Sequence, residues 1–357
     1  MDIKLFSLCK QEVPQTEAGK KHILKCVKAF FPDCEGFTPF TSQKRVLLAA
    51  AQSLRAADIV ILAVQSNMYN ATKRLLSEAL GLKIVKNKVV FDALTPLFET
   101  DRIKQSVLNA NSAFPKGSVL MPTDDMFNCG FVLSAGSQHI IFLPVEEPRA
   151  GEVVYGSLYD FFASICDKET AKSGINARHR AITKRTTDKL DEDSIKIAFA
   201  ASSVSATIEN ISSGIASNHC FTFKAKPTYY ENPSENLVEI SRELKNEQIA
   251  SFAVAFSDIE YNQQTEERTL KVAIADEAGT NAFAFFALAD ETDEEFVLNC
   301  IDKTMLLLYN YEKLAETDNL VEVTTKADQT LRKNLLYITA GAIGASTIIG
   351  LILSAIL

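Results

Sequence analysis

The chain has 357 residues, of which 47 % are hydrophobic and 23 % charged, and its formal net charge is −8. This composition is ordinary for a globular protein, and the negative charge argues against a broad nucleic-acid-binding surface. The seven cysteines form no C-x-x-C pair and the four histidines are scattered, so the sequence predicts no zinc site and no disulfide framework.

The first part of the chain alternates amphipathic and apolar segments. Ser42 can cap a helix whose apolar positions run to Leu54. The continuous apolar run at 59–64 predicts a strand covered on both faces. A second helix fits residues 71–80 and stops at Gly81.

The pattern continues as far as the middle of the chain. Residues 89–91 are predicted as a strand, and Thr100 can cap the helix that follows. Two apolar runs, 131–133 and 139–143, are joined by a turn that contains Gly136 and predict a hairpin. These elements indicate an α/β domain over residues 1–166, with a mostly parallel sheet and an added antiparallel pair.

A basic, polar stretch at 167–193 is predicted to connect this domain to the next, in part as a helix. Its basic residues are Lys168, Lys172, Arg178, Arg180, Lys184, Arg185 and Lys189. A solvated linker is the favoured interpretation, and the alternative is a patch that meets anionic lipid headgroups.

A second α/β domain is expected over residues 194–315. It begins with the apolar run 195–201, followed by predicted helices at 204–211 and 234–244. The runs 249–256, 269–275 and 282–288 are predicted strands. Asp293 can cap the last helix of this domain.

The chain ends in a polar tether at 316–334 and an uncharged segment at 335–357. At about 1.5 Å per residue a helix over this segment is long enough to cross a bilayer core. Lys326, Arg332 and Lys333 precede it, which predicts a single-pass tail anchor with the body facing the cytoplasm. Small residues four apart could pair two such helices in a homodimer: Ala342, Ser346, Gly350 and Ser354.

Three short motifs in the first half carry a resemblance to a known family. They are P-K-G-S-V-L-M-P at 115–122, Gly130 with Phe131, and I-I-F-L-P at 140–144. Together they resemble the closing segment of the molybdopterin-binding fold, in the form found in the competence/damage-inducible protein A (CinA) family. The resemblance covers roughly residues 45–150 and implies that fold for the first domain.

The departures from the family pattern fall on its binding loop. Where the family carries T-G-G-x-G-P-T-x-D-D, this chain reads I-L-A-V-Q-S-N-M-Y-N over residues 61–70. The family glycines allow the backbone to approach a phosphate or pterin closely, and this chain lacks them. The polar residues left as binding candidates are Asn67, Asn70, Thr72, Asp124 and Asp125.

The CinA family continues with a domain that hydrolyses nicotinamide mononucleotide through an A-E-S-C-T-G-G turn. The run A-A-S-S-V-S-A at 200–206 lies at a similar place, so the resemblance aligns Ser202 with the family nucleophile. The glutamate and both glycines of that turn are absent here, which puts activation of Ser202 in doubt.

Two main functions remain open from the sequence, beside a third interpretation in which the body is a spacer that presents the basic linker to lipid. The favoured one is a membrane-anchored, CinA-like binding module that has lost the family reactions, with a site filled by Leu62, Val64, Met68 and Phe127. The alternative is a nucleotide-processing hydrolase that cleaves a pyrophosphate, as in ADP-ribose, or an amide bond. Its catalytic groups would be Asp58, Asp124, Asp125 and Ser202, one of them with a strongly shifted pKa. The resemblance implies a nucleotide or pterin as ligand, and magnesium if the protein is an enzyme.

Overall fold

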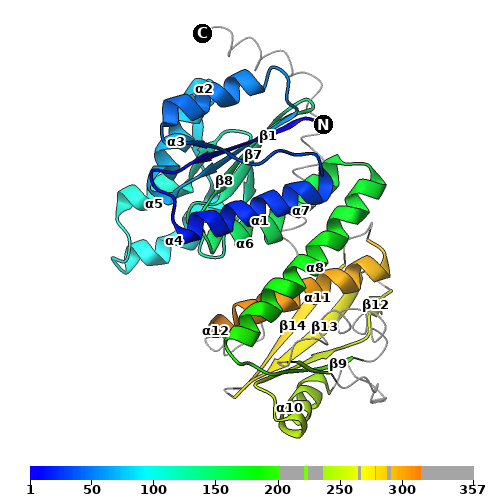
Figure 1. Cartoon of the computed structure of the whole chain (residues 1–357). Helices are drawn as coiled ribbons and strands as arrows, with labels where there is room; N and C mark the ends of the chain where they lie inside the picture. Colours follow the sequence, from blue (N-terminus) through cyan, green and yellow to red (C-terminus); the bar gives the residue numbers. More distant parts are fainter. Residues whose placement is uncertain (202–220, 224–235, 264–266, 278, 288–290, 315–357) are drawn as a thin grey trace. The chain divides into compact units, whose positions relative to one another are not determined.

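The computed structural model describes residues 1–201, 221–223, 236–263, 267–277, 279–287 and 291–314. It divides into two compact units, the first ending at Arg178 and the second beginning at His179. Each unit combines helices with a mixed sheet (Figure 1). The α/β class expected from the sequence is therefore confirmed for both.

A six-stranded sheet forms the centre of the first unit, in the order β2-β1-β3-β8-β7-β6. The strands β2, β1, β3 and β8 are parallel, whereas β7 and β6 are antiparallel additions. The hairpin predicted at 131–133 and 139–143 is confirmed as β7 paired with β8, in a mixed sheet that has four neighbouring strands parallel. The strands are β1 (Ile3–Leu8), β2 (Thr38–Phe40), β3 (Ile59–Val64), β6 (Val119–Met121), β7 (Gly130–Ala135) and β8 (Gln138–Pro144).

Helices cover both faces of this sheet. Every residue of β3 is buried, as predicted. Its alternate residues Val60, Leu62 and Val64 join one core with α2 (Gln43–Ser53) and α3 (Ser66–Ala79). On the opposite face lie α1 (Pro14–Phe30) and a segment made of α6 (Arg149–Val153), the π-helix η1 (Val154–Leu158) and α7 (Tyr159–Ile165).

The predicted strand at 89–91 is wrong, because these residues begin helix α4 (Lys88–Glu99). The Asn87 side chain caps this helix by accepting a hydrogen bond from the Val90 N–H at 3.2 Å. Thr100 follows the last turn of α4 and does not cap α5 (Gln105–Ser112). A small antiparallel sheet that the sequence did not predict joins β4 (Ile84–Lys86) to β5 (Ala113–Pro115).

A single helix, α8 (Lys168–Glu192), covers the stretch predicted as a linker. Arg178 is 5 % exposed and donates to Asp160 at 2.7 Å, so this part of the helix packs within the first unit. In the second unit, the Arg185 guanidinium lies 4.0 Å from the ring centre of Tyr309, and Lys189 donates to the Tyr309 carbonyl at 2.8 Å. Three of the seven basic residues are thus engaged in packing.

The second unit is built on a sheet in the order β10-β9-β11-β13-β12, with β14 also paired to β13. The predicted strands at 195–201, 249–256, 269–275 and 282–288 correspond to β9, β11, β13 and β14, and this part of the prediction is confirmed. The strands are β9 (Ile197–Ala201), β10 (Phe221–Phe223), β11 (Phe252–Phe256), β12 (Glu260–Asn262), β13 (Glu267–Ala275) and β14 (Thr280–Phe286).

Besides the part of α8 from His179 onward, the helices described in this unit are α10 (Leu237–Gln248), α11 (Asp293–Tyr309) and α12 (Tyr311–Leu314). The cap of α11 is Thr292 and not Asp293: the Thr292 hydroxyl accepts from the Glu295 N–H, and Glu295 accepts from the Thr292 N–H. This reciprocal pair satisfies two N–H groups that the helix itself cannot bond. The predicted helix at 204–211 lies outside the described residues.

Ile249, which follows α10, offers a direct test of backbone strain. It has φ of +50° and is 84 % exposed, an unfavourable conformation for a β-branched residue with little burial to offset it. We expect Ile249→Gly to raise the free energy of unfolding of the second unit by about 1 kcal/mol, because glycine adopts this conformation without a steric cost. Denaturant unfolding measures the change. Ile249→Ala is the matched control, since it removes the side chain but keeps the Cβ; an equal gain in both variants would contradict the explanation.

Within the described ranges no helix is long and apolar enough to span a bilayer. The segment predicted as an anchor, 335–357, lies outside these ranges, as does the tether at 316–334.

Candidate binding site at the carboxyl edge of the first sheet

Three neighbouring parallel strands of the first unit end at the same edge of the sheet. Leu8 of β1 is in register with Val64 of β3, and Val64 is in register with Pro144 of β8. The residues that follow these strand ends therefore lie close together. Ligands of open α/β sheets bind at this edge, so it is where a site is expected.

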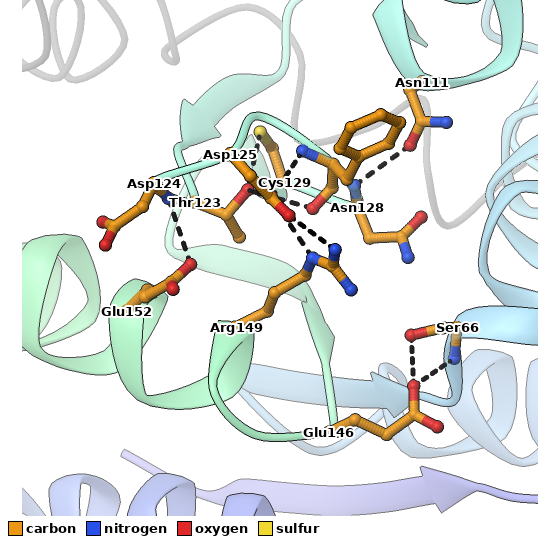
Figure 2. A network of polar contacts seen from close by, with 11 residues as sticks. Ser66, Asn111, Thr123, Asp124, Asp125, Asn128, Cys129, Glu146, Arg149 and Glu152 are labelled. Atoms are coloured by element: carbon orange, nitrogen blue, oxygen red, sulfur yellow. Dashed lines mark hydrogen bonds and ion pairs between the residues drawn. The ribbon is translucent and has the colours of Figure 1, made fainter. Parts of the chain in front are cut away.

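The N-terminus of α3 meets a carboxylate of the same chain. The Ser66 N–H donates to Glu146 Oε2 at 2.8 Å, and the Ser66 hydroxyl donates to the same oxygen (Figure 2). Glu146 follows β8 after Val145, which places it opposite the first turn of α3. A helix N-terminus carries partial positive charge and unpaired N–H groups, and both favour an anion there. Glu146 supplies that anion.

Gln65 joins the ends of β1 and β3. Its Oε1 accepts from the Lys10 N–H at 2.9 Å, and its Nε2 donates to the Gln11 carbonyl at 3.4 Å. Cys9 lies in the same strand end and is buried; burial, together with the charge of Glu12, raises the pKa of its thiol to about 11. Cys9 is therefore a neutral thiol near pH 7 and a poor nucleophile.

The second side of the site is the turn between β6 and β7, which holds Asp124 and Asp125. Both oxygens of Asp125 face Arg149 of α6: Nε donates at 3.2 Å and Nη2 at 2.5 Å (Figure 2). Asp125 also accepts from the Phe127 N–H at 3.0 Å. Burial acts to raise the pKa of Asp125, but the hydrogen bonds from Arg149 and Phe127 outweigh it and lower the pKa below the ordinary value. Asp125 is thus held as a carboxylate.

Further contacts hold the same turn in a strained conformation. The Asp124 N–H donates to Glu152 of α6 at 3.0 Å, and the Asn128 N–H donates to Asn111 at 3.0 Å. Met126 and Asn128 both have positive φ, +58° and +52°. Asparagine tolerates this conformation, whereas a long side chain such as methionine adopts it only when the surroundings enforce it.

The structure distributes the predicted binding residues among several environments. Asp124 and Asp125 share the turn described above, and Asn67 is exposed on α3. Asn70 also lies on α3; its Oδ1 is buried, and among the described residues no group donates a hydrogen bond to it. Thr72 is fully buried and bonded within the fold: it donates to the Met68 carbonyl and accepts from Gln43, both at 2.8 Å.

Of the residues proposed for hydrolysis, Asp124 and Asp125 lie at this site and Asp58 does not. Asp58 precedes β3, at the opposite end of that strand from Ser66, and accepts from the Asp2 N–H at 2.9 Å. Ser202 lies outside the described residues. In contrast, Leu62, Val64 and Met68 belong to the core of the first unit, and Phe127 packs against that core.

Four residues that form polar contacts at this site were not singled out from the sequence: Ser66, Glu146, Arg149 and Glu152. Glu146 and Arg149 lie in the run V-E-E-P-R after β8, and the family motif ends one residue before this run. Ser66 was missed because the helix was expected to begin at residue 71. A signal was available in the sequence, since Ser66 follows the apolar run at 59–64 after one residue and serine is common where helices begin.

The resemblance implies magnesium for an enzyme of this family, and the residues present do not fit such an ion. Both oxygens of Asp125 are directed at the Arg149 guanidinium, and a cation would have to displace that charge. Across the described part of the chain no group of three or more histidine, cysteine, aspartate or glutamate side chains is placed to hold a metal.

No family model matches the chain, and no curated protein matches it. Among solved structures, the chain is similar to the protein CinA with unknown function from Thermoplasma acidophilum, with 12 % identity and a TM-score of 0.36. That likeness covers 45 % of this chain and 97 % of the other. A TM-score this low does not establish a shared fold.

Proposed function

We propose that this chain is a membrane-anchored, CinA-like protein whose cytoplasmic body binds a ligand or partner without carrying out the reactions of the CinA family. The observation that carries the proposal is the position of Glu146. Its carboxylate takes the hydrogen bonds at the N-terminus of α3, where the family resemblance would put a phosphate. A phosphate arriving there would meet a negative charge.

Two further observations support a site that is not catalytic. Asp125 is paired with Arg149 and has a lowered pKa, so it cannot act as a general acid near pH 7. The strand end before α3 is apolar, because Leu62 and Val64 are both fully buried. The segment 61–70 also contains no glycine, the residue that lets the family backbone approach a phosphate closely.

The test is thermal unfolding of the full-length chain against nucleotides, nicotinamide mononucleotide, ADP-ribose and pterins, with and without magnesium. We expect no stabilisation by the phosphorylated compounds. A ligand at 100 times its Kd would stabilise the protein by about 2.7 kcal/mol, which is easily detected. Stabilisation by a nucleotide, or its turnover, would overturn the proposal and favour the hydrolase.

Support for the anchor comes from the sequence of residues 335–357 alone. Extraction of membranes with alkaline carbonate tests it: the full-length chain should stay with the membrane, whereas a chain ending at residue 334 should be released. A homodimer through Ala342, Ser346, Gly350 and Ser354 remains part of this proposal.

A further inference from the structure

The segment from β4 to the start of α4 exposes aliphatic side chains. Ile84 is 39 % exposed, Val85 43 % and Val89 62 %. Large apolar side chains are normal on a surface when they are isolated, but these three lie within six consecutive residues. We refer to residues 83–89 as the β4–α4 surface. The segment that carries α4 and α5 lies at the edge of the first unit, drawn in cyan in Figure 1.

Backbone hydrogen bonds fix the segment that carries this surface. The Lys116 N–H donates to the Lys83 carbonyl and the Asn87 N–H to the Ser112 carbonyl, both at 2.7 Å. Beneath it, Val90 and Phe114 are buried in the core of the unit. The exposure of Ile84, Val85 and Val89 is therefore a fixed feature of the fold, since the backbone that carries them is bonded at both ends.

Lysines alternate with these aliphatic residues. Lys83, Lys86 and Lys88 are all exposed, and no acidic residue occurs between Gly81 and Phe91. The surface is positive although the whole chain has a net charge of −8. The Lys86 ammonium group lies 3.5 Å from the ring centre of Phe91, a cation–π contact at the exposed end of this surface.

This combination fits one kind of partner better than the others. At a lipid interface, aliphatic side chains enter the boundary between headgroups and acyl chains, and lysines attract anionic headgroups. Protein–protein interfaces are depleted in lysine. Nucleic-acid interfaces are more polar than a surface centred on Ile84, Val85 and Val89.

We propose that the β4–α4 surface docks on an anionic lipid bilayer, with Ile84, Val85 and Val89 entering the interfacial region and the three lysines contacting headgroup phosphates. This contact is separate from the predicted anchor and from the site at the N-terminus of α3. It would hold the first unit against the membrane surface.

The chain contains no tryptophan, so a single introduced tryptophan reports its own surroundings. The experiment uses the full-length Val89→Trp variant incorporated into vesicles of phosphatidylcholine, with or without phosphatidylserine, and with brominated acyl chains as quenchers. The matched control is Leu48→Trp on α2, at a position 45 % exposed. We expect Val89→Trp emission to shift to shorter wavelength and to be quenched in the anionic vesicles, and Leu48→Trp emission to stay as in water.

Replacing Lys83, Lys86 and Lys88 by glutamate in the Val89→Trp background should remove the effect. Each lysine near an anionic surface contributes about a five-fold factor, so losing three lowers the docked population by about a hundred-fold. All three positions are exposed, so folding is preserved. Equal emission from the two tryptophan variants in anionic vesicles would overturn the proposal. The lysines would then serve only to keep the exposed strand edge from pairing with another chain. A shift without lipid that grows with protein concentration would also overturn it, in favour of a second copy of the chain.

Discussion

Lys73→Met is expected to stabilise the first unit at neutral pH and to remove part of its pH dependence. Lys73 lies on α3, is 3 % exposed, donates to the Ala110 carbonyl at 2.9 Å and lies 4.3 Å from the ring centre of Phe114. Burial disfavours the ammonium form and lowers the pKa of Lys73 from 10.5 to about 7.

The sign of the effect follows from proton binding. Between about pH 7 and pH 10.5 the unfolded chain keeps the Lys73 proton and the folded chain does not, so stability rises with pH in this window. Below pH 7 the buried Lys73 ammonium costs up to about 5 kcal/mol. Methionine is similar in length and carries no charge, so the variant does not bury an ammonium group. It loses the hydrogen bond to the Ala110 carbonyl, which reduces the gain in stability by about 1 kcal/mol.

Denaturant unfolding of the full-length chain and of Lys73→Met between about pH 6 and pH 9 measures this effect, because other titrating groups cancel in the difference. Lys21→Met, which replaces an exposed lysine of α1, is the control and should leave the profile unchanged. If the free energies of unfolding of the wild type and of Lys73→Met changed with pH in parallel, Lys73 would keep its proton in the folded chain. That result would contradict the lowered pKa.

Gly19→Ala is expected to destabilise the first unit by about 3 kcal/mol. Gly19 lies on α1, where the helix crosses the end of β8. A Cβ at this position would lie 1.9 Å from the Val145 carbonyl oxygen and 2.8 Å from the Ala150 Cβ. The first of these is a backbone atom next to Glu146, so α1 would have to move away from the strand end that positions the site.

The matched control is Gly156→Ala in η1, where an added Cβ meets nothing within 4 Å. This substitution should be neutral or stabilise by about 0.5 kcal/mol, because alanine loses less backbone freedom than glycine in a helix. Thermal unfolding of both variants measures the contrast. Similar losses in the two variants would show that the close approach at Gly19 is not what fixes α1.

The sequence correctly predicted the strands whose runs of apolar residues reflect their burial in the sheet. The run at 59–64 was recognisable as β3 because both faces of that strand are covered, and the hairpin of β7 and β8 was recognisable from its two apolar runs and Gly136. The prediction failed at 89–91, where three strand-forming residues begin a helix. There the cap from Asn87 and the packing of Val90 outweigh local propensity.

The candidate site was only partly accessible from the sequence. Asp124 and Asp125 were named as polar residues near the expected cleft, beside the motif at 115–122 that carries the family resemblance. Their partner Arg149 lies 24 residues beyond Asp125, and the contact exists only because the turn and α6 are brought together by the folded sheet. Glu146 and Ser66 are 80 residues apart, and no local pattern links them.

The absence of glycine from the loop at 61–70 and the position of Glu146 have one physical explanation. Without the family glycines, the backbone before α3 is a buried apolar strand end, and the helix N-terminus still requires an acceptor. Glu146 meets that requirement from within the chain, which stabilises the fold at the position where the resemblance would put a ligand phosphate.

Thermal unfolding of the full-length wild type and Glu146→Ala in increasing inorganic phosphate, at ionic strength held constant with chloride, tests this account most directly. The control is Glu152→Ala, which removes a carboxylate that accepts from the Asp124 N–H on the other side of the site. We predict that phosphate stabilises Glu146→Ala, by about 2.7 kcal/mol at 100 times its Kd, and leaves the wild type and Glu152→Ala unchanged. Equal stabilisation of the wild type and Glu146→Ala, or none in either, would contradict the claim that Glu146 takes the place of a phosphate.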